Sequence, residues 1–152
     1  MSTVKLEVPV SPPDLYAVLS DGWMYASWVV GASHIRDVDE NWPDPGAQVH
    51  HTVGVWPVTI SDTTEVVECE PNRLLVLDAR AFPAGRAAVR IELHPAGPGR
   101  TRIEMTEKVT GGPGALIPSL LTDPLLDARN RESLRRLTDI ALGRRHSMAH
   151  QH

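Results

Sequence analysis

The chain has 152 residues, of which 41% are hydrophobic and 22% charged, a composition ordinary for one globular domain. Nineteen acidic against fifteen basic residues give a net charge of -4, which argues against nucleic acid as a partner. The single Cys69 excludes an internal disulfide, and no segment reaches the ~20 apolar residues of a membrane span, so we expect a cytoplasmic protein.

The chain begins with an alternating segment. From Thr3 to Val10, valine and leucine occupy every second position, the pattern of a half-buried strand. Ser11 then predicts the capped start of a short helix at Leu15–Leu19. A second short segment, Trp23–Trp28, is rich in aromatic residues, which suit either the closing of an apolar space or ordinary core packing.

Six further strands are predicted between residues 32 and 109, separated by turns rich in glycine and proline. No separator is long enough for a helix, so we expect an antiparallel meander. In the third of these strands Asp62 and Thr64 share the parity of Ile60, whereas Val67 and Cys69 have the opposite parity, which predicts a β-bulge. The predicted ranges are Ala32–Val38, Ala47–Val55, Val58–Glu70, Leu74–Phe82, Ala87–His94 and Thr101–Val109.

A long helix is predicted near the C-terminal end, from Leu125 to Leu142. Asp123 is expected to be its N-cap, Pro124 its first residue and Gly143 its end. Beyond it, we expect residues 146–152 to be a disordered tail after a single domain that spans residues 1–145.

Two polar residues interrupt the apolar stripe of this helix. At about 100° per residue, Asn130 and Ser133 fall among Leu134, Leu137 and Ala141. Buried without partners, each would cost about 1–3 kcal/mol. We therefore expect them to have hydrogen-bonding partners or to face a cavity.

The order of these elements resembles the START-like helix-grip superfamily, and within it the polyketide cyclase/dehydrase and lipid-transport (SRPBCC) family. The resemblance lies in LEVPVSPPDLYAVLSD near the start, VVECEPNRLLVLDARA and TRIEMTEKV in the strands, and RNRESLRRL in the helix. It implies an α+β fold in which a seven-stranded curved antiparallel sheet wraps around the C-terminal helix. It also implies a ligand in an apolar cavity between sheet and helix, roofed by the short helices.

Several side chains are predicted to reach such a cavity. His51 shares its strand face with Val49 and Val53, either as a proton donor or acceptor or as a hydrogen-bonded core histidine. Glu107 follows Met105 on the same face, either as a cavity carboxylate or as a strand-end residue in water. The expected ligand-binding residues are Tyr25, Trp28, His51, Asp62, Glu107, Asn130 and Ser133.

Two functions follow from this interpretation. The first is the binding of a small hydrophobic ligand, whether lipid, aromatic or polyketide-like, as a carrier or sensor. The alternative is a polyketide cyclase or dehydratase acting on a poly-carbonyl substrate, with His51 and either Asn130 or Tyr25 as its catalytic residues. The type II polyketide aromatase/cyclases are similar in having an inward asparagine on the long helix, which Asn130 matches. They also carry a cavity arginine, which Ala47–Val55 and Val58–Glu70 lack.

The remaining features bear on partners and cofactors. Trp56, beside Pro57 at a hairpin corner, is predicted to lie at the cavity mouth or in a subunit interface, which leaves monomer and homodimer open. A third function, chaperone-ATPase activation as in a neighbouring branch of the superfamily, has no recognisable surface. The sequence has no HExxH motif, glycine-rich phosphate loop or Cys/His cluster, so we expect no metal and no cofactor.

Overall fold

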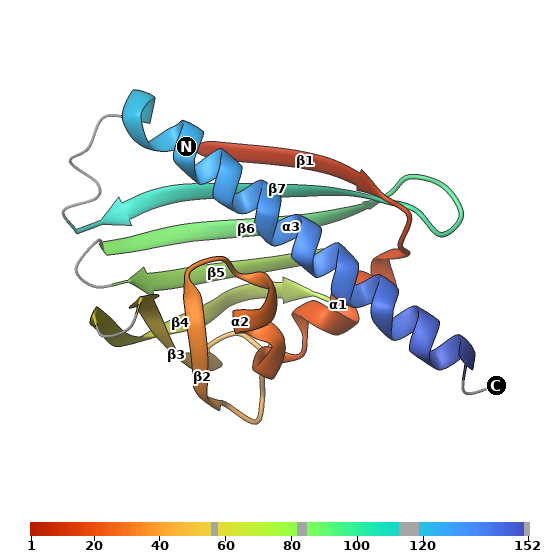
Figure 1. Ribbon diagram of the computed structural model, residues 1–152, viewed down its shortest axis with the longest axis horizontal. Coiled ribbons are helices and arrows are strands. Elements are labelled where there is room, and N and C mark those ends of the chain that lie inside the picture. The colour runs from red at the N-terminus through yellow and green to blue at the C-terminus, as the bar shows by residue number, and fades with distance from the viewer. Residues whose placement is uncertain (56–57, 82–84, 113–118, 151–152) are drawn as a thin grey trace.

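The computed structural model describes residues 1–55, 58–81, 85–112 and 119–150, and in this part of the chain seven strands form one antiparallel sheet (Figure 1). The strand order is β1-β7-β6-β5-β4-β3-β2, so β2 to β7 are the predicted meander and β1 returns to pair with β7. The strands are β1 (Ser2–Val8), β2 (Ala32–Val38), β3 (Gln48–Val55), β4 (Val58–Glu70), β5 (Leu74–Ala81), β6 (Gly85–Pro95) and β7 (Thr101–Gly111).

One face of this sheet, called the dry face below, is apolar and buried because the apolar positions of neighbouring strands are in register. Val4 pairs with Met105, Met105 with Ile91, and Ile91 with Leu75, and all four are buried. Each of these strands therefore contributes to one row of the core, as the alternation of its residues predicts.

The predicted bulge in β4 is present. The register of β4 against β5 shifts between Val66 and Glu68, so Val67 is the extra residue and its side chain is 55% exposed. Val66 is buried, and Cys69, beyond the bulge, also packs against the core. The bulge thus turns Val67 outward and keeps both parities of β4 on the dry face, which explains the mixed pattern.

Two short helices and a 3-10 turn follow β1. Helix α1 (Pro12–Leu19) begins at the predicted cap, where the Ser11 hydroxyl accepts from the Asp14 N–H at 3.4 Å. The 3-10 turn η1 (Gly22–Met24) leads into α2 (Tyr25–Trp28), whose two aromatic end residues are buried. Both α1 and α2 pack against the long C-terminal helix.

The long helix α3 (Ser119–His150) crosses the dry face diagonally (Figure 1). Leu134 and Leu137 are fully buried at its centre, as the apolar stripe predicts. The helix also packs against β1 and β7. Among the described residues, no helix is long and apolar enough to cross a membrane.

Both predicted ends of this helix were wrong. Pro124 lies inside the helix, where it removes one N–H donor, and Asp123 is no cap but accepts from the amine of Met1 at 3.0 Å. Gly143 does not end the helix, because a glycine inside a helix costs only about 1 kcal/mol. The next residue, Arg144, donates through Nη2 to Asp21 Oδ2 at 2.7 Å, and Asp21 lies just after α1. Residues 146–150, predicted to be disordered, are therefore helical.

Candidate functional site

A pocket of about 310 Å³ lies between the dry face of the sheet, α2 and α3. Its wall is mostly apolar, with valine, alanine, leucine and methionine side chains from the sheet and the helices. Six of the seven predicted ligand-binding residues line it: Tyr25, Trp28, His51, Glu107, Asn130 and Ser133.

Asp62 is the residue that the structure does not place on this wall. It pairs with His51 across β3 and β4, but its carboxylate accepts from the neighbouring Thr63 N–H at 2.8 Å. Strand parity gives the face of a residue and not how far along that face a pocket extends, so a role of Asp62 in ligand binding stays a prediction.

Three polar side chains on the pocket wall form a hydrogen-bonded chain. The Thr64 hydroxyl lies 2.8 Å from His51 Nε2 and 3.1 Å from the Tyr25 hydroxyl, and the rings of Tyr25 and His51 stack at 5.5 Å. His51 is 3% exposed, and its Nδ1 has no partner among the described residues. Thr64 was missed because its hydroxyl matters only once β3 and β4 are paired.

Burial determines the protonation states of the His51 and Tyr25 side chains. It lowers the pKa of His51, an effect that the charge of Asp62 partly offsets, and it raises the pKa of Tyr25. An imidazole with a lowered pKa and a phenol with a raised pKa are both neutral at pH 7. His51 can therefore accept a proton or make neutral hydrogen bonds near neutral pH.

An ion pair joins α3 to β7 on the same wall. Arg129 Nη2 lies 2.5 Å from both carboxylate oxygens of Glu107, whose residue is 4% exposed. The Arg129 side chain is 40% exposed, so the pair extends from the interior to solvent. Arg129 was missed, although it lies three residues after Leu126 and four before Ser133, a spacing that puts all three on one helix face.

Asn130 and Ser133 have partners and also line the pocket, so both alternatives that the sequence left open apply to them. Asn130 Nδ2 donates to the Ser2 hydroxyl at 3.5 Å, and that hydroxyl donates to Asp127 Oδ1 at 2.5 Å. The Ser133 hydroxyl accepts from the Val30 N–H at 3.1 Å. No signal in the sequence pointed to Ser2, which lies 128 residues from Asn130.

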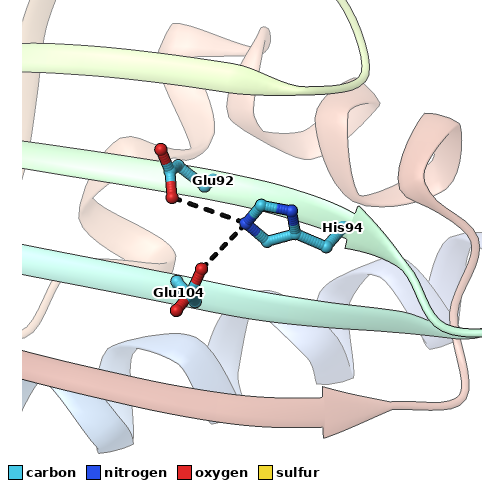
Figure 2. Close-up of side chains that lie close together, drawn as sticks. All are labelled: Glu92, His94 and Glu104. Carbon is cyan, nitrogen blue, oxygen red and sulfur yellow. Dashed lines mark hydrogen bonds and ion pairs between the residues drawn. The ribbon is translucent and has the colours of Figure 1, made fainter.

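A second polar cluster lies outside this pocket, where Glu92, His94 and Glu104 bring three potential metal-ligand atoms together (Figure 2). His94 Nε2 is 2.8 Å from one oxygen of Glu104 and 3.4 Å from one of Glu92. Lys5 and Arg90 already pair with the other oxygens, at 3.2 and 2.9 Å. Each of the two carboxylates therefore already faces a side-chain cation.

Trp56, predicted to lie at the cavity mouth or in an interface, is outside the described residues.

Comparison with known proteins places the chain among relatives of one fold. Residues 2–141 match the family described as polyketide cyclase / dehydrase and lipid transport. No curated protein matches the sequence.

Several solved structures share the architecture. A protein from Nitrosomonas europaea is 18% identical with a TM-score of 0.69, and the match covers 93% of this chain and 94% of that one. The ZhuI aromatase/cyclase from a Streptomyces species is 16% identical with a TM-score of 0.66, covering 93% of each chain. Ara h 8.0201 is 15% identical with a TM-score of 0.64, covering 93% and 97%. These similarities confirm the helix-grip fold.

Proposed function

Since the chain belongs to the polyketide cyclase/dehydrase and lipid-transport family, we propose that it binds a small, largely apolar ligand in the pocket between the sheet and α3. The observation that carries this proposal is the pocket itself, whose apolar wall holds a few convergent polar groups. The protein then acts as a carrier or sensor of that ligand.

The size of the pocket narrows the ligand class. Small-molecule pockets span roughly 300–1,000 Å³, so about 310 Å³ is at the lower end. A compact molecule, such as a fused aromatic system or a short acyl chain, fits this volume better than a lipid with two long chains. The stacked rings of Tyr25 and His51 and the indole of Trp28 favour an aromatic ligand.

Neighbouring alanines on β6 provide a matched test. Ala87 lines the pocket, whereas Ala88 is exposed. We expect Ala87→Trp to fill the pocket and abolish binding, and Ala88→Trp to leave binding unchanged. Native mass spectrometry of wild-type protein purified from its own host should show a retained small molecule that is absent from Ala87→Trp. Equal retention by both variants would contradict the proposal.

Polyketide cyclase or dehydratase activity is the second candidate, and the neutral, buried His51 on the pocket wall favours it. In this function His51 removes a proton next to a carbonyl group, and the Tyr25 hydroxyl or the Asn130 N–H that is not bonded to Ser2 stabilises the oxygen. Incubation with a poly-carbonyl thioester would then give a cyclised product with the wild type and none with His51→Gln, while both proteins bind the substrate. Binding by both without product would exclude the enzyme.

A further inference from the structure

We propose that Ser2 and Asp127 hold the Asn130 amide in one orientation, so that the pocket offers a hydrogen-bond acceptor beside a donor and selects an apolar ligand that carries a hydroxyl group. This inference rests on the proposed function, because it assigns the ligand of the same pocket.

The orientation of the amide follows from a count of hydrogens. The Ser2 hydroxyl has one hydrogen, and a carboxylate can only accept, so that hydrogen is used in the 2.5 Å bond to Asp127 Oδ1. Toward Asn130 the hydroxyl can then only accept. Nδ2 of Asn130 must therefore face Ser2, and Oδ1 must point away from it.

Asn130 is 1% exposed, and among the described residues Ser2 is the hydrogen-bond partner of its side chain. Because Nδ2 faces Ser2 and Asn130 lines the pocket, its Oδ1 is the amide atom left for a ligand in the pocket. One turn further along α3, the Ser133 hydroxyl accepts from Val30, but its own hydrogen has no acceptor among the described residues. Residues three apart on a helix lie on one face, about 5–6 Å apart at Cβ. The wall thus presents an acceptor and a donor side by side.

A hydroxyl group matches this pair because it donates to Asn130 Oδ1 and accepts from Ser133. An ether oxygen can only accept, so it leaves Oδ1 unsatisfied. A carboxylate also only accepts and brings its charge against the amide oxygen, while the nearby Arg129 is already paired with Glu107.

The test uses three probes of one aromatic skeleton, measured by isothermal titration calorimetry: 2-naphthol, 2-methoxynaphthalene and 2-naphthoate. We expect the wild type to bind 2-naphthol about tenfold more tightly than the ether, the equivalent of one hydrogen bond, and the naphthoate most weakly. Ser2→Ala should reduce the preference for 2-naphthol over the ether, measured as the ratio of their dissociation constants, to about twofold. Without the Ser2 hydroxyl, the Asn130 amide can rotate and present either its oxygen or its nitrogen to the ligand. Ser2→Thr, which keeps the hydroxyl, should restore the preference.

Two further variants separate orientation from folding. Thr3, the exposed neighbour of Ser2 on β1, is the matched control, and Thr3→Ala should leave the ratio unchanged. At the half-buried position 127, Asp127→Asn replaces a side chain that can only accept by one that can also donate, so the direction of the Ser2 hydrogen is no longer fixed. We expect this variant to lose part of the preference for 2-naphthol over the ether.

The outcomes distinguish this inference from the proposed function. If all probes bind the wild type but with equal affinity, or if Ser2→Ala and Asp127→Asn keep the wild-type ratio, the inference is overturned and the apolar pocket stands. If none of the three probes binds the wild type, the proposed ligand-binding function is overturned and the inference with it.

Discussion

The imidazole of His51 has one bonded and one unpartnered nitrogen in a wall that is otherwise largely apolar. The Nε2 atom is tied to Thr64, and the stacked ring of Tyr25 covers one face of the imidazole. A proton added to this ring gives a charge with few partners, which is why burial lowers its pKa.

This lowered pKa predicts a loss of stability in mild acid. In the unfolded chain His51 takes up a proton as the pH falls through about 6.5, whereas the folded chain binds it only at lower pH. Between these two pKa values the free energy of unfolding should fall by up to about 1.4 kcal/mol per pH unit, and above them His51 contributes no pH dependence. Denaturant titrations at pH 7.5, 6.5 and 5.5 should show a shallower dependence in His51→Gln than in the wild type. Parallel pH profiles would show that His51 does not titrate as described.

The Glu107–Arg129 ion pair leads to a second prediction about single residues. Arg129→Met leaves the buried Glu107 carboxylate without its cation, and we expect a loss of about 1–3 kcal/mol, less than for a fully buried pair because Arg129 is partly exposed. Arg131→Met, an exposed position on the same helix, is the control and should change stability by less than about 0.5 kcal/mol. Equal losses in chemical denaturation would mean that the ion pair does not stabilise the fold.

Among the elements, α3 depends on the centre of its apolar stripe. Leu134 and Leu137 are fully buried against the sheet and the short helices, so either change to alanine should cost about 2–5 kcal/mol. Leu125 is 74% exposed on the same helix, and Leu125→Ala should cost less than about 0.5 kcal/mol. Urea denaturation checks all three variants. A loss below about 1 kcal/mol at both central positions would show that the helix is held elsewhere.

The β4 bulge shows how an element can carry a mixed sequence pattern. Both Val66 and Cys69 pack toward the core although they are three residues apart, because Val67 is the unpaired extra residue. A uniform two-residue period would have put one of them in solvent.

At the scale of the whole molecule, the pocket is lined by residues from α2, from strands β2 to β7 and from α3, so ligand binding should stabilise the entire fold. With 2-naphthol at a hundred times its Kd, the free energy of unfolding of the wild type should rise by about 2.7 kcal/mol. The Ala87→Trp variant should show no rise, because its pocket is filled. A similar rise in both proteins would place the binding site elsewhere.

Local patterns were enough for most of the fold. The positions of the strands, the Ser11 cap and the Leu134 and Leu137 stripe follow from apolar periodicity and capping chemistry, which act within a few residues. The family resemblance that the order of the elements carries implied the helix-grip sheet and its cavity, and strand parity and helix periodicity then predicted six of the pocket-lining residues.

The tertiary structure decided what depends on residues far apart in the chain. The helix extends past Gly143 as Arg144 meets Asp21, and the Asn130 amide is oriented by Ser2, 128 residues away. Sequence periodicity predicts which face of an element is apolar, but it does not predict which polar groups on that face come within hydrogen-bonding distance of one another. That distance depends on how the sheet packs against α3, so the partners of Asn130 and Glu107 were found only in the structure.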